Sequence, residues 1–224
     1  ASSINVPAVK LLALVGVDKV LVQGFKMGLN SLEPTKETIS RVGLSMALGG
    51  AEVKLLELTG AYGAFANGGL KITPVSILKI EDGSGATIYE KKQVKQERVV
   101  DEKIAFLVNS VLSDNNARLL TFGPNSYLNM GNKAIAVKTG TTNDLRDNWT
   151  VGWSPGFVVG VWVGNNNNEK MKNVASGVSG AAPIWRRQIV EVMKLKPETS
   201  FAQPSGVVQI EVDRVSGYPA HDGY

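Results

Sequence analysis

The chain has 224 residues and is 43% hydrophobic, which is enough to bury a sizeable core in one domain. Its 24 Lys and Arg residues against 20 Asp and Glu residues give a formal charge of +4. No basic block is visible, so we expect an ordinary charged surface and no nucleic-acid partner. No stretch approaches the roughly 20 apolar residues of a membrane span.

Histidine and cysteine chemistry is excluded by composition. The chain has no cysteine and one histidine, His221, near its end among Gly, Pro and Asp. Thiolate catalysis, cysteine-ligated zinc and a Ser-His-Asp triad therefore do not fit, and we expect neither a metal nor a cofactor. Proton transfer at neutral pH has to use lysine, carboxylates or hydroxyls.

Two short helices are predicted at the start of the chain. The first begins near Pro7, which suits the first turn of a helix, with Ser3 or Asn5 as its capping residue. It ends at Gly16, because glycine adopts the backbone conformations that follow a helix. The second covers residues 18–28, beginning at an aspartate and ending at a glycine.

The middle of the chain combines a helix with a β-hairpin. After a polar connection over 29–39, a central helix is predicted over 52–66, because apolar residues recur there at steps of three and four, namely Leu55, Leu58, Tyr62 and Phe65. Strands at 72–80 and 87–89 are predicted to form a hairpin around the turn 82–85.

The second half is predicted to form a helix, a long connection and then a sheet. Asp101 caps a helix whose apolar positions follow the same spacing, at Ile104, Leu107, Val108 and Val111. After the long connection 113–133, three strands joined by short turns and ending with 157–163 predict an antiparallel sheet. A final helix from Pro183 packs against this sheet with one apolar face, made of Trp185, Ile189, Val192 and Met193. Alternating Val208, Ile210 and Val212 predict a last strand.

The most informative stretch is 138–142, Lys-Thr-Gly-Thr-Thr, directly after the apolar, β-rich segment 134–137. Its glycine lets a substrate backbone approach closely, and its lysine can hold an anionic group. Lys-Thr-Gly alone is also explained by a strand edge blunted with a lysine. Ser3-Ile4-Asn5 supplies a second motif, although Ser3 and Asn5 taken alone are better explained as caps of the first helix, and only the pairing with Lys138 reverses this. Together, the two triplets are two of the three motifs of serine enzymes that act on D-alanyl peptides and β-lactams.

Further stretches resemble the transpeptidase domain of class A bifunctional penicillin-binding proteins. They are the segments Lys138–Trp149, Phe157–Gly164, Leu48–Val53, Ala61–Gly68 and Ala181–Trp185. The resemblance extends in the same order from Ser2 to about Arg187, and this collinearity is more specific than either triplet.

The resemblance implies an α/β fold of the α+β type, with an antiparallel sheet flanked by helices, as in serine β-lactamases and DD-transpeptidases. Residues 1–196 would be the transpeptidase domain without its amino-terminal part. Residues 197–224 would be a carboxyl-terminal extension, either an edge strand or the start of a further region.

The reaction implied by the resemblance is peptidoglycan cross-linking by acyl transfer. A serine attacks the carbonyl between two D-alanines of a stem peptide, D-alanine leaves, and an amine of a neighbouring stem takes the acyl group. The catalytic residues would be Ser3, which relays a proton, Asn5, which holds the substrate amide and the catalytic lysine, and Lys138, which supplies positive charge. Substrate binding would use Thr139, Gly140, Thr141 and Thr142, with an oxyanion-hole N–H from Thr141.

The nucleophile of this reaction is missing from the pattern. In the family, the motif Ser-x-x-Lys supplies nucleophile and base and lies upstream of Ser-x-Asn, whereas this chain begins inside the Ser-x-Asn region. Its only Ser-x-x-Lys, at Ser76 and Lys79, falls in a strand pattern, where residues three apart point to opposite faces. We therefore reject that pair and expect a nucleophile upstream of residue 1. The chain alone would then be inactive, and an amino-terminal fragment would complete the site.

Two other functions are compatible with the motifs. A β-lactamase would need a glutamate to hold a deacylating water, and no segment obviously supplies one. A non-catalytic module that binds β-lactams or peptidoglycan would keep the groove without turnover. For the leading reading, the resemblance implies stem peptides and β-lactam antibiotics as ligands. It also implies a glycosyltransferase domain and a membrane anchor in the parent chain, at the outer face of the bacterial cytoplasmic membrane.

Side chains next to the Lys-Thr-Gly stretch are given structural roles. Trp149 and Trp153 are predicted to lie in the core instead of stacking on a substrate. Arg146 and Asp147 are predicted to form a turn or an ion pair instead of acting as acid catalysts.

Overall fold

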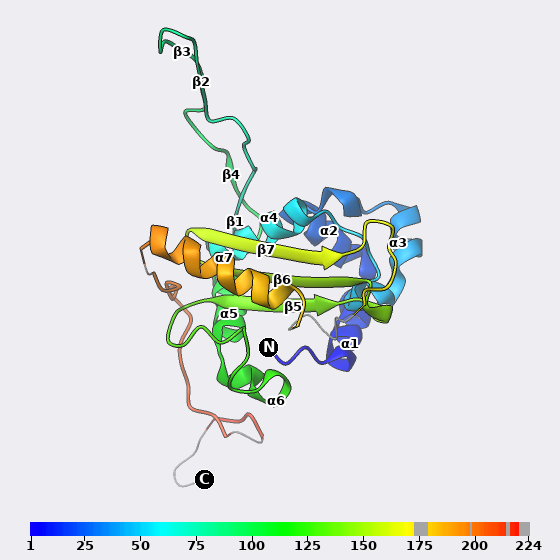
Figure 1. The fold of residues 1–224 in the computed structure, drawn as a ribbon. Helices are drawn as coiled ribbons and strands as arrows, with labels where there is room; N and C mark the ends of the chain where they lie inside the picture. The colour runs from blue at the N-terminus through cyan, green and yellow to red at the C-terminus, as the bar shows by residue number, and fades with distance from the viewer. Residues whose placement is uncertain (173–178, 198, 214–215, 220–224) are drawn as a thin grey trace.

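The computed structural model describes residues 1–172, 179–197, 199–213 and 216–219. Its centre is a three-stranded antiparallel sheet of order β5–β6–β7, made of Ala136–Thr141, Asp147–Ser154 and Phe157–Gly164. Helices flank this sheet, which confirms the predicted α+β class (Figure 1). In the described sheet β5 pairs only with β6 and is therefore an edge strand.

Alternation along the strands gives the sheet two apolar faces. On one face, side chains of β5 and β7 pack against helix α7 (Ala181–Leu195), through Val137, Val159, Val161, Trp185 and Ile189. On the other face, Ala136, Val151 and Trp153 pack against helix α4 (Leu55–Ala66). The prediction that the final helix covers the sheet is confirmed.

Two details fix helix α7 on the sheet. The Asn148 side-chain oxygen accepts a hydrogen bond of 2.7 Å from the backbone N–H of Ala181, the first residue of the helix. Gly152 allows the indole of Trp185 to approach, because a Cβ at position 152 would lie 2.2 Å from that ring. Neither contact follows from the apolar periodicity that predicts the helix.

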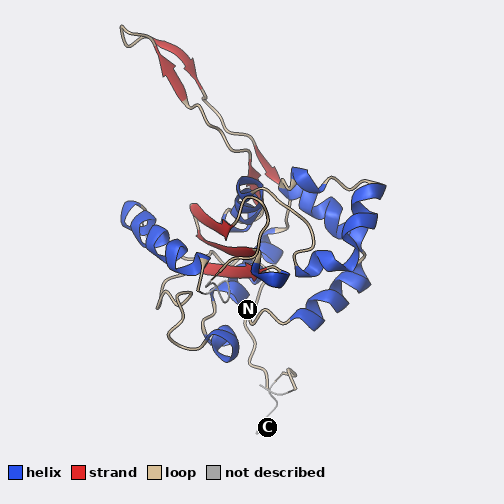
Figure 2. Cartoon of the chain, turned by 45° about the vertical axis from the view of Figure 1, so that its right-hand side comes forward, coloured by secondary structure: helices blue, strands red, loops and turns tan. Residues whose placement is uncertain are grey.

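The amino-terminal helices form a separate small layer beside the sheet (Figures 1 and 2). Helices α1 (Asn5–Val15) and α2 (Val17–Met27) are confirmed, and Gly16 and Gly28 end them. The predicted cap of α1 is wrong, because Ile4 holds the N-cap position and no side chain caps the helix.

The polar connection predicted over 29–39 contains helical structure. It holds the 3₁₀ turn η1 (Asn30–Leu32) and the start of helix α3 (Lys36–Val42), and the 3₁₀ segment η2 (Gly43–Leu48) follows. The Thr35 hydroxyl oxygen accepts from the backbone N–H of Thr38 and caps α3. Buried Leu21, Leu32 and Val42 join these pieces to α2.

Helix α4 begins at Leu55, three residues after the predicted start. Tyr62 and Phe65 pack on Trp153, with ring centroids 4.9 and 6.3 Å apart, as the predicted face requires. Leu55 is exposed, and the fully buried positions of the helix are small instead, namely Ala61, Ala64 and Ala66. Small residues let the helix lie close to the sheet, so a pattern of large side chains overlooks them.

The predicted hairpin is present as the tip of an extended arm, residues 73–95, which projects away from the sheet (Figures 1 and 2). Strands β2 (Lys79–Glu81) and β3 (Thr87–Glu90) pair antiparallel at its tip. At its base, β1 (Leu70–Ile72) pairs with β4 (Gln96–Arg98). The prediction of one continuous strand over 72–80 is wrong, because the chain is irregular between β1 and β2. Pro74 lies in this interval and has no backbone N–H to donate to a neighbouring strand.

Helix α5 (Glu102–Ser113) confirms Asp101 as a cap, since its carboxylate accepts from the backbone N–H of Lys103 at 2.9 Å. The apolar spacing predicted the helix, but three of its four positions, Ile104, Leu107 and Val111, are more than half exposed. The helix instead buries Ala105 and Asn109. The Asn109 amide donates to the carbonyl of Phe65, and its oxygen accepts from the indole of Trp153 at 2.7 Å.

The remaining connections differ from prediction in two places. The segment 113–133 contains the 3₁₀ turn η3 (Asn116–Arg118) and the short helix α6 (Leu119–Phe122). The last strand predicted around 208–212 is wrong: in the described part of the tail the only ladder contact is one isolated bridge between Val212 and Pro219. Among the described helices, none is long and apolar enough to cross a membrane.

Candidate active site

One pocket of about 320 Å³ brings together all seven residues predicted from the motifs. The start of the chain contributes Ser3 and Asn5, and strand β5 with the residue after it contributes Lys138, Thr139, Gly140, Thr141 and Thr142. The lining is completed by Leu58 and Tyr62 of α4 and by part of the segment before this helix, namely Ala47, Leu48, Gly49 and Ala51. Two motifs more than 130 residues apart in sequence therefore share one cavity.

A direct hydrogen bond joins the two motifs. The Lys138 ammonium donates to the Ser3 hydroxyl at 2.8 Å and to the carbonyl of Thr139 at 2.5 Å. The hydroxyl can accept this bond and still donate its own proton to a third group. The pair thus has the connectivity of a proton relay.

Residues 116–121 hold the segment that carries Ser3. The Ser2 hydroxyl donates to the Ala117 carbonyl at 2.8 Å, and the Thr121 hydroxyl donates to the Ser2 carbonyl at 3.0 Å. Ser3 itself adopts a left-handed backbone conformation with φ 59°, which is uncommon for a residue with a side chain. Sequence reasoning missed these supports, because Ala117 and Thr121 lie more than 110 residues from Ser2 and form no recognisable motif with it.

The buried side chain of Arg118 stabilises the segment 116–121, which holds Ser2. The Arg118 guanidinium donates to the carbonyls of Leu112 and Leu128. Burial lowers the pKa of Arg118 from its ordinary value. These bonds fasten the η3 turn, which carries the Ala117 carbonyl, to the end of α5.

Burial lowers the pKa of Lys138 from its ordinary value. A buried ammonium has lost hydration, so the neutral amine is favoured relative to a lysine in water. A lowered pKa increases the fraction of neutral lysine near neutral pH. Only the neutral amine can accept a proton, as a proton relay without histidine requires.

The lowered pKa predicts a pH dependence of stability. Between the folded pKa of Lys138 and the unfolded value of about 10.4, the unfolded chain binds more protons, so the free energy of unfolding rises with pH. The Lys138→Met variant lacks this contribution. We expect its stability advantage over the parent chain to be largest at pH 7 and to shrink as the pH approaches 10. Urea unfolding of both chains over this range measures the difference, and a constant difference would contradict the prediction.

The remaining residues of β5 present different surfaces to the pocket. Thr139 is nine-tenths buried, whereas Gly140 and Thr141 are exposed. A Cβ at Gly140 would lie 3.6 Å from the Cβ of its sheet partner Trp149, an ordinary contact. Sheet packing therefore does not require glycine at this position.

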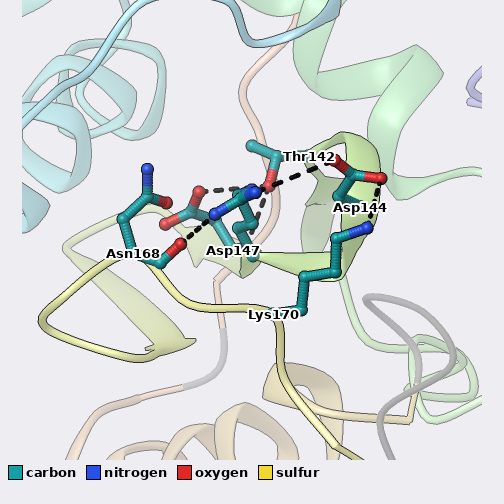
Figure 3. Close-up of polar contacts among 6 residues, drawn as sticks. Thr142, Asp144, Asp147, Asn168 and Lys170 are labelled. Carbon is teal, nitrogen blue, oxygen red and sulfur yellow. Dashed lines mark hydrogen bonds and ion pairs between the residues drawn. The ribbon is translucent and has the colours of Figure 1, made fainter.

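Thr142 closes the loop that follows β5. Its hydroxyl donates to the Asp147 carboxylate at 3.1 Å and accepts from the backbone N–H of the same residue at 2.8 Å (Figure 3). The other carboxylate oxygen of Asp147 accepts from the indole of Trp162 at 2.9 Å. Thr142 lines the pocket, but its hydroxyl is engaged within the protein.

The predicted turn or ion pair at 146–147 takes the form of a hydrogen-bonded loop. Asp144 and Leu145 adopt left-handed conformations, with φ 63° and 56°. The Asp144 carboxylate pairs with Lys170 at 2.9 Å and more loosely with Arg146 at 3.9 Å, and Arg146 also donates to the Asn168 carbonyl (Figure 3). The loop is thereby tied to the chain that follows β7.

The two tryptophans predicted as core residues behave differently. Trp153 is fully buried, as predicted. Trp149 is only partly buried and lines the pocket beside Val151, so its prediction as a core residue is wrong. In β6, Trp149 stands directly opposite Gly140 of β5, and Val151 stands opposite Lys138. This register places both β6 residues next to the motif.

The described residues contain no metal site, and the Ser76 and Lys79 pair lies outside the pocket. No group of three or more His, Cys, Asp or Glu side chains within these ranges is arranged to hold a metal ion. Ser76 is exposed in the arm, and Lys79 pairs with Glu81 at 2.5 Å.

A helix-flanked antiparallel sheet, with Lys-Thr-Gly on its edge strand and Ser-x-Asn hydrogen-bonded to it, defines a protein of the transpeptidase class. A family model described as the penicillin binding protein transpeptidase domain matches residues 2–189, and the chain belongs to this family.

Relatives and solved structures support this assignment. The chain is 31% identical to penicillin-binding protein 2D of Bacillus subtilis over 231 residues, covering 100% of this chain and 31% of the relative. It is 34% identical to penicillin-binding protein 1A of Aquifex aeolicus over 216 residues, covering 95% and 28%. A crystal structure of penicillin-binding protein 1A from Haemophilus influenzae shares the fold, with a TM-score of 0.85 at 23% identity, over 99% of this chain and 38% of that one. The chain thus spans about a third of the length of these curated relatives.

Proposed function

We propose that this chain supplies the second half of the active site of a peptidoglycan DD-transpeptidase. The single observation that carries this proposal is the 2.8 Å hydrogen bond from Lys138 to Ser3 inside the pocket lined by both motifs. Membership of the transpeptidase family supports the same reaction.

In the proposed reaction, a serine hydroxyl attacks the carbonyl carbon between two D-alanines. The serine proton passes to the base lysine of the Ser-x-x-Lys motif, a C–O ester bond forms, the C–N bond breaks, and the leaving nitrogen takes a proton. Ser3 and Lys138 are suited to deliver that proton, because they are hydrogen-bonded to each other at the pocket. An amine of a second stem then attacks the ester carbon, a new C–N bond forms, the ester C–O bond breaks, and the proton lost by the amine returns to the serine oxygen.

The other pocket residues are assigned to substrate binding. Asn5, at the first turn of α1, would hold a substrate amide. Thr139, Gly140 and Thr141 lie along the edge strand, where an extended peptide can add its backbone, and Thr141 would contribute an oxyanion-hole N–H. Thr142 would line the substrate pocket without a hydrogen bond to the substrate, because its hydroxyl and its backbone N–H are bonded to Asp147 and its carbonyl accepts from Leu145.

We also propose that the nucleophilic serine and its base lysine lie upstream of Ala1, so that this chain alone is inactive. The exposed position of Ser76 in the arm supports this, since it is not among the residues that line the pocket. An amino-terminal fragment or an upstream segment of the parent chain would complete the site. The parent protein would carry a glycosyltransferase domain and a membrane anchor, would act outside the cytoplasmic membrane on stem peptides, and would be acylated by β-lactams.

Intact-mass spectrometry after incubation with penicillin tests this proposal. We expect no covalent adduct on the chain alone, and an adduct on the upstream piece when both pieces are combined. An adduct at Ser76, located by peptide mapping, would show that the nucleophile lies in this chain. If the pieces associate and neither gains mass, the non-catalytic binding module becomes the better explanation.

A further inference from the structure

A hydrogen-bonded cluster beside the catalytic pocket has no role in the function proposed above. At its centre is the carboxylate of Asp147, the first residue of β6. One of its oxygens accepts from the Thr142 hydroxyl at 3.1 Å (Figure 3). The other oxygen accepts from the Trp162 indole at 2.9 Å. The Asp147 side chain therefore connects the end of β5 with β7.

The main chains of Thr142 and Asp147 are also bonded to each other. The Thr142 N–H donates to the Asp147 carbonyl at 3.1 Å, and the Asp147 N–H donates to the Thr142 hydroxyl oxygen at 2.8 Å. The loop between them contains Asp144 and Leu145 in left-handed conformations, with φ 63° and 56°. Such conformations persist only where the surrounding structure holds them, and the Thr142–Asp147 bonds close the base of this loop.

The third member of the cluster, Trp162, is fixed by its own strand. A Cβ at Gly164 would lie 2.5 Å from a carbon of the Trp162 ring and 2.9 Å from the Arg146 carbonyl, so glycine leaves room there for both. Gly164 also stands directly opposite Asp147 in the register of β6 and β7. The indole is thus a fixed donor that anchors the Asp147 carboxylate to the sheet.

These contacts determine the surroundings of Thr141, the residue before Thr142. Opposite residues of an antiparallel pair alternate between exchanging hydrogen bonds and not exchanging them. Because the Thr142 N–H is directed to β6, the Thr141 N–H is directed to the free edge of β5. Thr139, two residues earlier, has the same orientation, and its carbonyl accepts from the Lys138 ammonium at 2.5 Å. The N–H proposed for the oxyanion hole therefore belongs to the residue next to the one that Asp147 holds.

We propose that Asp147 is a positioning residue for acylation. By joining Thr142 to Trp162, its carboxylate fixes the end of β5 and with it the Thr141 N–H. The inference rests on the function proposed above, in which this N–H stabilises the oxyanion, and such a donor is effective only when it is preorganised. Asp147 does not line the catalytic pocket, so it acts through Thr142, which does.

Acylation kinetics with penicillin, in the protein that contains both halves of the site, test the proposal. In Asp147→Ala we expect the acylation rate constant to fall about tenfold to hundredfold, less than the roughly 10² to 10³-fold lost with an oxyanion donor itself. The dissociation constant of the initial non-covalent complex should change by less than about threefold, since the oxyanion forms only during the reaction. Asp147→Asn should recover most of the rate, because its amide can accept from the Trp162 indole and donate to the Thr142 hydroxyl oxygen.

The matched control is Asp144→Ala, which removes a carboxylate from the same loop and breaks only its exposed pairs with Lys170 and Arg146. Its acylation rate should stay within about twofold of the parent. Asp147→Ala combined with Thr142→Val should be no slower than the slower single variant, because both changes remove the same contact. An unchanged rate in Asp147→Ala would overturn the proposal, while acylation of the parent would leave transpeptidation standing. A rate in Asp147→Asn as low as in Asp147→Ala would also overturn it, because the charge and not the contacts would then matter.

Amide hydrogen exchange of this chain gives a readout that does not depend on acylation. In Asp147→Ala, exchange of the Thr142 N–H should accelerate at least about tenfold relative to that of Ile189, which is buried in α7. Equal acceleration of both amides would show a general loss of stability and overturn the positioning role, as would unchanged exchange at Thr142. If the parent is not acylated, the function proposed above fails, and hydrogen exchange still decides whether Asp147 fixes Thr142.

Discussion

Replacing Lys138 with alanine is expected to slow acylation by penicillin by about 10² to 10⁴-fold in the protein that contains both halves of the site. The substitution removes the ammonium that donates to Ser3 at 2.8 Å and the positive charge beside β5. Stopped-flow or mass-resolved acylation kinetics, with a large excess of penicillin, measure the rate directly.

The matched control is Lys170→Ala. Lys170 also carries one positive charge and pairs with Asp144 of the neighbouring loop, but it does not line the catalytic pocket. Acylation of this variant should stay within about twofold of the parent, since a surface ion pair contributes little. Equal acylation rates for Lys138→Ala and the parent would show that Lys138 does not take part in the reaction.

Replacing Trp153 with alanine is expected to lower the free energy of unfolding by about 3–5 kcal/mol. The indole is fully buried between the sheet and α4, contacts Tyr62 and Phe65, and donates to Asn109 at 2.7 Å. The variant loses this packing and leaves the Asn109 oxygen without its donor. Urea unfolding followed by circular dichroism gives the change.

Two further variants separate packing from hydrogen bonding. Trp153→Phe keeps an aromatic ring but not the donor to Asn109, so its loss should be smaller than that of Trp153→Ala. Trp162→Ala removes an indole that is only partly buried and should cost clearly less. A loss below about 1 kcal/mol for Trp153→Ala would mean that this core does not hold α4 on the sheet.

The sheet and most helices could be predicted because their sequence patterns are local. The strand runs around 138 and 157, the capping residue Asp101 and the helix-ending Gly16 each act within a few residues. The face of α5 could not be predicted in this way. Its buried positions are Ala105 and Asn109, and Asn109 is buried because its amide and oxygen bond to Phe65 and Trp153, which lie more than 40 residues away.

The candidate site shows the same division. The lysine, the glycine and the hydroxyls of β5 are recognisable as a motif, but that Lys138 reaches Ser3 depends on how the first residues cross the molecule. In the sequence, only the resemblance to a family links Ser-x-Asn with Lys-Thr-Gly. Trp149 was misassigned, because alternation along β6 does not distinguish a fully buried position from one at the edge of a cavity.

The arm over 73–95 has a practical consequence for anyone who needs to label this protein. Its tip, residues 82–85, is exposed and is held by local bonds of Asp82 to Ser84 and Ala86. A fluorophore or an affinity tag inserted there would displace no core side chain, and loop tips of this kind tolerate insertions. Because the arm projects away from the sheet, such a tag would report on the molecule without occupying its cavities (Figure 2).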